Sequence, residues 1–216
     1  MLALFDLDNT LIDRRGGLEL WARNFVSSRH LPREAASVVC DQLWERAYPT
    51  DFVRLKAALG LSESPDDLWR EYVTGVARSV RCFPGVLEGL EALRHAGWAL
   101  GVATNGAGDI QRAKLAATGL ASLFDGVCVS GDVGVRKPGR GHFEAAIALC
   151  GGDPRHRAGH WMVGDNPETD IAGASRAGLR TMWVANGRRW TYGPREPHTV
   201  VRDATEAIGV LQGLTR

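Results

Sequence analysis

The spacing of hydrophobic positions divides the chain into two parts. Over residues 14–82, apolar residues recur at the spacing of amphipathic helices. Four helices are expected there, and two of them begin near Pro32 and Pro65, because proline is favoured in the first turn of a helix. This stretch has no strand pattern. We therefore predict a small helical bundle with its aromatic side chains in the core.

The rest of the chain alternates between short apolar runs and helical patterns. Strands are expected at residues 2–5, 98–103, 126–129, 161–163, 181–184 and 199–201. Repeated strand-helix units form parallel sheets with helices on both faces. We expect an α/β fold with a Rossmann-like parallel core made of residues 1–13 and 83–216. The helical bundle at residues 14–82 is then a domain inserted after the first strand.

Composition narrows the class of protein. The 216 residues carry 26 basic and 25 acidic side chains, and a formal net charge of +1 favours neither nucleic acid nor a membrane surface as a partner. No apolar stretch approaches the ~18 residues of a membrane helix. The four cysteines form no CxxC motif and no secretory leader precedes them, so a cytoplasmic location is expected. The sequence leaves open whether the protein is a monomer or a homodimer.

Two carboxylates follow the first predicted strand. Asp6 and Asp8 come directly after the apolar run of residues 2–5, and their spacing points both to the same side. A buried carboxylate is unfavourable unless a cation or hydrogen bonds compensate it, so the pair indicates a metal site or a proton-transfer site. A polar strand end that leads into an Asp-Asn turn is the alternative that the pair alone leaves open.

Further polar groups follow the other predicted strands. Thr104 and Asn105 come after the second strand, and Lys137 follows the third by a short loop. Asp165 and Asp170 come after the fourth strand. Ligands of open α/β sheets bind beyond the carboxyl ends of the strands, so these residues are expected to converge on one site.

In order and spacing these residues resemble the haloacid dehalogenase superfamily, and within it the phosphatases that carry a helical cap after the first strand. The matching parts are Asp6-Leu7-Asp8-Asn9-Thr10, Thr104, Lys137, and Gly164-Asp165 with Asp170. The resemblance covers essentially the whole chain, with residues 14–82 as the cap. It implies a Mg²⁺-dependent phosphatase that hydrolyses a small phosphorylated metabolite through an aspartyl-phosphate intermediate.

The resemblance also implies a task for each acidic residue. Asp6 would attack phosphorus, whereas Asp8 would protonate the leaving oxygen and then deprotonate the attacking water. Mg²⁺ prefers six oxygen ligands and would be held by Asp6, Asp165 and the backbone carbonyl of Asp8. Asp170 would hold a metal-bound water or brace Lys137.

The phosphoryl group calls for hydrogen-bond donors and a cation. By the same resemblance, Thr104 and Asn105 would bind its oxygens, and Lys137 would supply a fixed positive charge. Lysine is scarce in this chain, since only Lys56, Lys114 and Lys137 occur beside 23 arginines. The presence of Lys137 at the position that the motif requires therefore supports the resemblance.

Other functions share parts of this pattern. Dehalogenases of the superfamily attack carbon, need no Mg²⁺ and lack the second aspartate, which is Asp8 here. Phosphonate-cleaving members replace that aspartate with a small residue and use a cap lysine, for which this chain offers Lys56. A phosphomutase or phosphotransferase uses the same residues as a phosphatase and stays open. A non-catalytic phospho-acceptor module is disfavoured, because such modules are shorter and lack the helical insertion.

The cap is expected to close over the site as a lid, which favours a small substrate over a phosphoprotein. Gly16, Gly17 and Gly85 lie in its two linkers and are predicted to act as hinges. The substrate itself is not readable from the sequence. The candidates for contact with the leaving group are Arg14, Arg15, Arg46, Tyr48 and Arg54. The histidines expected at the surface or at strand edges, without the spacing of a zinc pair, are His142, His156 and His160.

Overall fold

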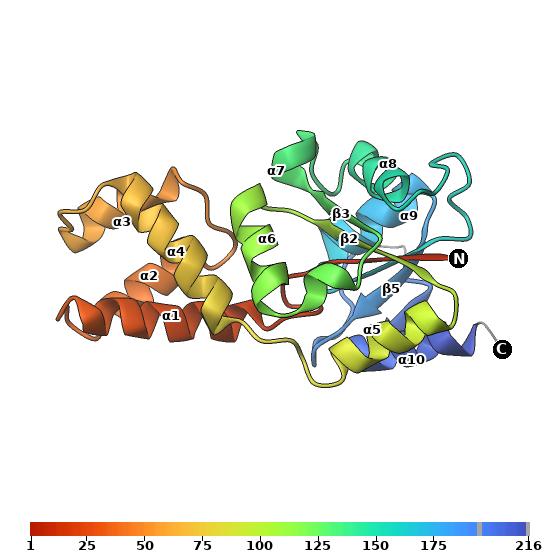
Figure 1. Ribbon diagram of the computed structural model, residues 1–216, viewed down its shortest axis with the longest axis horizontal. Helices are drawn as coiled ribbons and strands as arrows, with labels where there is room; N and C mark the ends of the chain where they lie inside the picture. Colours follow the sequence, from red (N-terminus) through yellow and green to blue (C-terminus); the bar gives the residue numbers. More distant parts are fainter. Residues whose placement is uncertain (194–195, 215–216) are drawn as a thin grey trace.

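Six parallel strands form the sheet of the computed structural model, which describes residues 1–193 and 196–214. The strand order is β3-β2-β1-β4-β5-β6, which places β1 inside the sheet (Figure 1). The strands are β1 (Leu2–Phe5), β2 (Ala99–Thr104), β3 (Gly126–Val129), β4 (Trp161–Gly164), β5 (Arg180–Val184) and β6 (Thr199–Val201). This confirms the predicted α/β class with a parallel, Rossmann-like sheet, and the strands lie close to their expected positions.

Helices cover both faces of the sheet. Alternate side chains of β1 point to opposite faces, and since all of them are apolar, both faces must be buried. Leu2 and Leu4 pack in one apolar cluster with residues of α8 (Arg140–Leu149) and α9 (Gly173–Ala177). Ala3 and Phe5 pack in a second cluster on the other face. The helices of that face are α5 (Val86–His95), α6 (Gly108–Ala117) and α10 (Ala204–Gly213). Two short segments, η1 (Leu120–Ser122) and α7 (Ser130–Val133), were not expected from the sequence.

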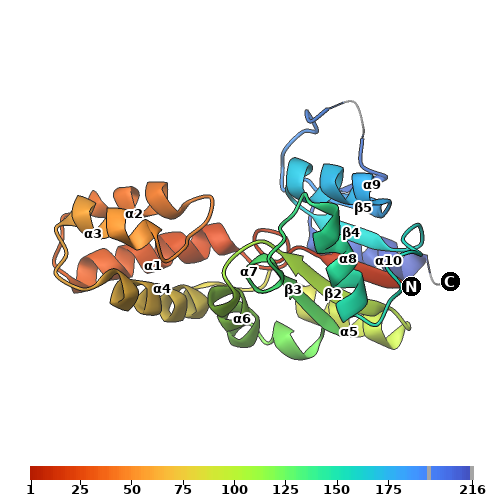
Figure 2. The same ribbon diagram turned by 90° about the horizontal axis from the view of Figure 1, so that it is seen from above.

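The helices inserted after β1 form a lobe beside the sheet (Figures 1 and 2). They are α1 (Arg14–Ser28), α2 (Ala35–Leu43), α3 (Asp51–Leu59) and α4 (Pro65–Ser79). Aromatic rings pack at the centre of this lobe with centroids 4.9–5.6 Å apart. These rings belong to Trp21, Phe25, Phe52, Trp69 and Tyr72, all of which are buried. The predicted helical bundle with an aromatic core is therefore present.

Two linkers connect the lobe to the sheet and run side by side. The backbone N–H of Asp13 donates to the carbonyl of Arg81 at 2.9 Å. Gly16 and Gly17 lie within α1. A Cβ at Gly17 would lie 2.6 Å from a methyl carbon of Val80, so the close approach of α1 to the end of α4 requires glycine there. The hinge prediction for these glycines stays a prediction.

One expectation about the histidines is wrong. His142 on α8 is fully buried, and its Nδ1 lies 2.9 Å from the carbonyl oxygen of Val135. That carbonyl satisfies one ring nitrogen, which allows a polar side chain on the inner face of the helix. Burial lowers the pKa of His142 to about 4, so the ring is neutral at physiological pH.

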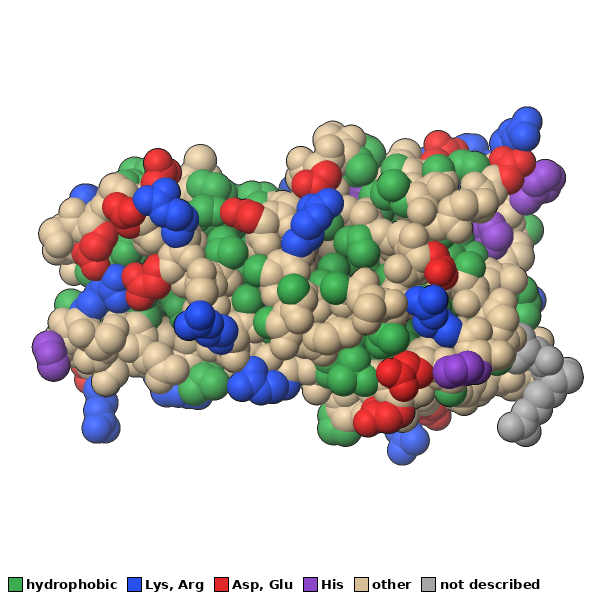
Figure 3. Space-filling view, viewed as in Figure 1, with side chains coloured by type: hydrophobic (Ala, Val, Ile, Leu, Met, Phe, Trp, Pro, Cys, Tyr) green, Lys and Arg blue, Asp and Glu red, His purple; other side chains and the backbone are tan. Residues whose placement is uncertain are grey.

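The surface carries charges of both signs. Basic and acidic side chains are interspersed over the face shown in Figure 3. Of the helices within residues 1–193 and 196–214, none combines the length and the apolar character needed to cross a membrane.

Candidate active site

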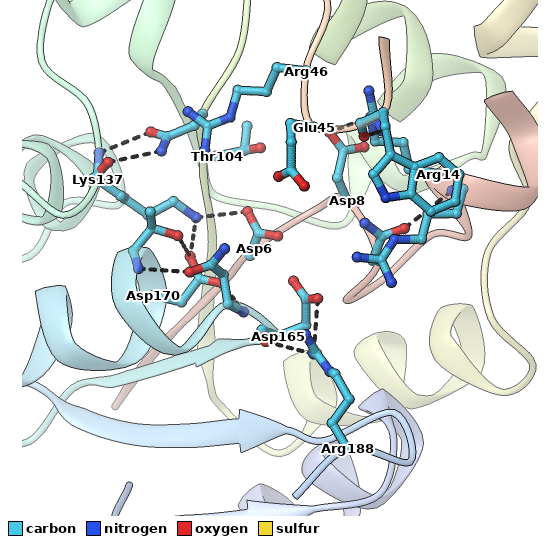
Figure 4. Close-up of a pocket in the computed structure, with 16 residues that line it drawn as sticks. Asp6, Asp8, Arg14, Glu45, Arg46, Thr104, Lys137, Asp165, Asp170 and Arg188 are labelled. Atoms are coloured by element: carbon cyan, nitrogen blue, oxygen red, sulfur yellow. Dashed lines mark hydrogen bonds and ion pairs between the residues drawn. The ribbon is translucent and has the colours of Figure 1, made fainter. Parts of the chain in front are cut away.

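The predicted site residues converge on a cavity of about 100 Å³ at the carboxyl ends of the inner strands (Figure 4). Asp6 directly follows β1, Thr104 ends β2 and Asp165 directly follows β4. Lys137 comes from the loop between α7 and α8. Because β2, β1 and β4 are adjacent and parallel, their ends lie side by side.

Lys137 lies at the centre of the charged groups. Its Nζ is 2.7 Å from Oδ1 of Asp6 and 2.7 Å from Oδ1 of Asp170, and its side chain is 1% exposed. Burial alone would lower the pKa of Lys137, but these two carboxylates raise it above its ordinary value. The Lys137 ammonium is therefore a fixed cation beside the predicted nucleophile.

Asn105 fixes the backbone of that lysine. Its Oδ1 accepts from the N–H of Lys137 at 2.9 Å, and its Nδ2 donates to the Lys137 carbonyl at 3.0 Å. The side chain of Asn105 thus ties the loop after β2 to the loop that carries Lys137. Its contact with a phosphoryl oxygen stays a prediction.

Asp6, Asp165 and Asp170 form a buried acidic cluster. One carboxylate oxygen of each lies within 4.8 Å of the others. Burial, together with neighbouring carboxylates, raises the pKa of Asp6 to about 8 and the pKa of Asp165 to about 6. Such a cluster of hard oxygen donors fits a divalent cation, which would favour the ionised carboxylates.

The loop after β4 is held by several contacts. Asn166 caps the wide helical turn η2 (Pro167–Ala172), and its N–H donates to Oδ2 of Asp170 at 3.0 Å. Trp183 Nε1 donates to the carbonyl of Asp165 at 2.9 Å. Arg188 donates to Oδ2 of Asp165 at 3.1 Å. Oδ1 of Asp165 and Oδ2 of Asp6 accept no hydrogen bond from the described residues, so each is available to a cation.

Asp8 has a different set of partners from Asp6. Lys114 Nζ lies 2.6 Å and 2.8 Å from its two carboxylate oxygens. Gln111 Nε2 donates to Oδ2 at 3.2 Å, and Arg14 Nε lies 4.0 Å from the same oxygen. Burial alone would raise the pKa of Asp8, but Lys114 and Arg14 hold it below its ordinary value. The sequence did not identify Lys114 or Gln111 as site residues.

Thr104 is oriented by the same glutamine. Its Oγ1 accepts from Gln111 Nε2 at 2.6 Å, and the side chain is buried. Because a hydroxyl has one hydrogen, this bond leaves the hydrogen of Thr104 available to another acceptor. That arrangement suits a donor to a phosphoryl oxygen.

The lobe contributes the other side of the cavity. Figure 4 shows Glu45 and Arg46 reaching over the cavity opposite Asp6, from the loop between α2 and α3. Arg14 anchors this loop, because its guanidinium donates to the carbonyl of Leu43 at 2.6 Å and to that of Trp44. Three of the predicted leaving-group candidates, Arg14, Arg15 and Arg46, line the cavity. Tyr48 and Arg54 do not line it, and Arg54 instead pairs with Asp51 on the surface.

Comparison with known proteins identifies the family to which this chain belongs. The family model described as haloacid dehalogenase-like hydrolase matches residues 3–184. A phosphoserine phosphatase of Thermus thermophilus is 32% identical over 234 residues, which cover 91% of this chain and 91% of that protein. A phosphoglycolate phosphatase of Agrobacterium fabrum is 30% identical, with 94% and 88% covered. The crystal structure of a HAD phosphatase from Thermococcus onnurineus is similar with a TM-score of 0.70 and 26% identity over 97% of both chains. The chain therefore belongs to the haloacid dehalogenase-like hydrolases.

Proposed function

We propose that this protein is a Mg²⁺-dependent phosphatase that hydrolyses a small phosphorylated metabolite through a phosphorylated Asp6. The observation that carries the proposal is the buried cluster of Asp6, Asp165 and Asp170 about Lys137, at the carboxyl end of the central strand. Similarity to phosphoserine and phosphoglycolate phosphatases over most of the chain supports a phosphate monoester as substrate.

Asp6 and Asp165 would hold Mg²⁺ together with the backbone carbonyl of Asp8. The free oxygens of the two carboxylates support this assignment, since Mg²⁺ prefers oxygen ligands. When bound, the ion would neutralise charge on the phosphoryl group. Asp170 uses its two oxygens for Lys137 and for the N–H of Asn166, which favours the bracing task over direct ligation.

Asp6 would form a covalent bond to phosphorus as the ester oxygen leaves. Lys137 is close enough to stabilise the charge on Asp6 and on the transferred group, and Thr104 has a hydrogen available for a phosphoryl oxygen. Water would then attack phosphorus and release phosphate. Nucleophilic catalysis accelerates a reaction in this way, because it replaces one difficult step with two easier ones.

Asp8 would exchange protons in both steps. The carboxylate paired with Lys114 is the form needed to activate water in the second step. The first step needs the protonated form, which a bound phosphate dianion favours, because a neighbouring negative charge raises the pKa of a carboxyl group. A phosphotransferase, in which a hydroxyl of an acceptor replaces water, would use the same groups.

We further propose that residues 14–82 act as the cap and that residues 1–13 and 83–216 form the core domain. The loop with Glu45 and Arg46 would then contact the leaving group. Arg15, Arg46 and Arg188 supply positive charge around the cavity. This favours a leaving group that itself carries a carboxylate, as phosphoserine and phosphoglycolate do.

The test is a phosphate-release assay with Mg²⁺ against phosphoserine, phosphoglycolate, sugar phosphates and nucleotides, in parallel with Asp6→Asn. Turnover of at least one small monoester is expected in the wild type, with no turnover by the variant. Absence of activity against the whole panel, with the fold intact, would refute the proposed function. Equal activity of wild type and variant would instead refute the assignment of Asp6.

A further inference from the structure

Helix α6 holds the carboxylate of Asp8 from behind the phosphoryl site. Lys114 Nζ contacts both oxygens of Asp8, at 2.6 Å and 2.8 Å, and Gln111 adds a bond of 3.2 Å to Oδ2. Lys114 and Gln111 are buried, with a side-chain exposure of only 3% for Lys114. Two contacts from one ammonium restrict the rotation of the carboxylate more than a single contact does.

Gln111 connects Asp8 to Thr104. Its Nε2 donates to Oδ2 of Asp8 and, at 2.6 Å, to Oγ1 of Thr104. Gln111 and Lys114 are three residues apart and lie on one face of α6, so one rigid helix fixes both contacts. Gln111 therefore fixes the position of the Asp8 carboxylate relative to Thr104, which is proposed to bind the phosphoryl group.

Helix α6 is itself attached to the helical lobe. Trp69 Nε1 on α4 donates to Oδ2 of Asp109, in the first turn of α6, at 2.6 Å. Arg14 approaches Asp8 from the lobe as well, at 4.0 Å. The support of Asp8 thus includes groups from both sides of the cavity.

We propose that Lys114 is a positioning residue for Asp8: it holds the carboxylate in the orientation in which Asp8 exchanges a proton with the leaving group and with water. This inference rests on the proposed function, because it assigns Lys114 to the acid-base part of that reaction. Lys114 does not line the cavity, so it acts through Asp8 and not on the substrate.

The dependence on the leaving group separates positioning from a purely structural ion pair. An alkyl ester needs a proton on its departing oxygen, whereas 4-nitrophenolate leaves readily as an anion. Loss of a positioned acid therefore slows the first substrate class and spares the second. A general loosening of the fold would slow both classes alike.

The experiment measures kcat/KM for the best alkyl monoester and for 4-nitrophenyl phosphate in wild type, Lys114→Met and the matched control Lys56→Met. Lys56 lies in the lobe and donates only to the carbonyls of Ser62 and Glu63 among the described residues. We expect Lys114→Met to lose about 100-fold on the alkyl ester and less than about 3-fold on the aryl ester, since misplaced catalytic groups cost about 10² in rate. Lys56→Met should match the wild type on both substrates.

Two further variants connect the effect to Asp8. In an Asp8→Asn background, Lys114→Met should cause no additional loss on the alkyl ester, because the group that it positions is already absent. Lys114→Arg should recover part of the alkyl activity, since it restores a cation. Equal losses on both substrates in Lys114→Met, or an additional loss in the Asp8→Asn background, would overturn the proposal.

Removal of a buried ammonium can also prevent folding, which circular dichroism would reveal. In that case Lys114→Arg carries the test, since it keeps a buried cation but changes where that cation contacts Asp8. It should lose about 10-fold on the alkyl ester with the aryl ester unchanged, and a uniform loss would refute the inference. Failure of the wild type on every ester would refute the proposed function, whereas an active wild type without leaving-group selectivity in these variants would refute the inference alone.

Discussion

The acidic cluster predicts that the metal-free protein becomes less stable as the pH rises toward 8. Asp6 has a pKa of about 8 in the folded protein and an ordinary value of 3.8. Between these values the folded state holds a proton that the unfolded state lacks. Because protons then bind the folded state preferentially, the free energy of unfolding falls with rising pH.

The size of this pH effect follows from the number of protons released, and its cause is the close spacing of the carboxylates. Carboxylate oxygens of Asp6, Asp165 and Asp170 lie within 4.8 Å of one another, and two unit charges at about 5 Å repel by about 3 kcal/mol at an effective dielectric constant of about 20. One excess proton changes the free energy of unfolding by at most about 1.4 kcal/mol per pH unit. From pH 6.5 to 7.5 the Asp6 contribution should therefore fall by about 1 kcal/mol.

The perturbation is Asp6→Asn, which removes this proton while keeping the shape of the side chain. Urea denaturation of both proteins in EDTA at pH 6.5, 7.0 and 7.5 gives the difference in stability, in which contributions from titrating groups outside the acidic cluster cancel. The free energy of unfolding of the variant should increase relative to that of the wild type as the pH rises. Loss of the Asp6–Lys137 contact also lowers the stability of the variant, so the test is how the difference between the two proteins changes with pH.

Mg²⁺ should remove most of this pH dependence in the wild type. A cation that binds the ionised carboxylates stabilises the folded state by mass action, and it competes with protons. The stabilisation by Mg²⁺ should therefore grow from pH 6.5 to 7.5 and be much smaller in Asp6→Asn. A pH-independent difference between the two proteins in EDTA would show that folding does not disfavour the ionised form of Asp6, and the reasoning would fail.

Three further predictions concern the site. Lys137→Met should lower kcat/KM by about 10³ or more, because the ammonium that contacts Asp6 is lost; a loss below about 10-fold would contradict its assignment. EDTA should abolish turnover and Mg²⁺ should restore it, whereas Ca²⁺ should not, since the larger ion takes more ligands at longer distances; full activity with Ca²⁺ alone would contradict this. Arg14→Met should destabilise the protein by about 2 kcal/mol and raise KM, because the carbonyls of Leu43 and Trp44 lose a charged donor, whereas the exposed Arg54→Met should do neither.

The strands and the residues at their ends could be predicted because each signal is local. An apolar run such as residues 2–5 identifies a strand buried on both faces, and the βα alternation then requires a parallel sheet. Polar residues that follow such strands must meet at one edge, which brings Asp6, Thr104 and Asp165 together. Lys137 was predictable only through the spacing of the motif, since it lies in a loop.

The support of Asp8 could not be predicted for a physical reason. Gln111 and Lys114 lie 103 and 106 residues from Asp8 in sequence, and on a helix their spacing looks like an ordinary polar face. Which face of α6 turns toward the site depends on how the helix packs, and no local pattern encodes it. The scarcity of lysine was the one available signal for Lys114.

The burial of His142 was wrongly predicted, and the burial of Arg14 could not be foreseen. In both cases backbone carbonyls supply the partners that allow burial: Leu43 and Trp44 for Arg14, and Val135 for His142. Such partners come from loops whose paths the sequence does not specify.

The most direct test of the central claim is to trap the phosphorylated enzyme. Asp8→Asn is mixed with 4-nitrophenyl phosphate and Mg²⁺, quenched in acid during the first turnover and digested, and the peptide that contains residues 1–14 is analysed by mass spectrometry. Asp8→Asn slows the attack by water, so the phosphoryl group should accumulate on Asp6 and should be absent when Asp6→Asn is added. Release of nitrophenolate without any phosphoryl group on Asp6, or with the group on another residue, would contradict the account.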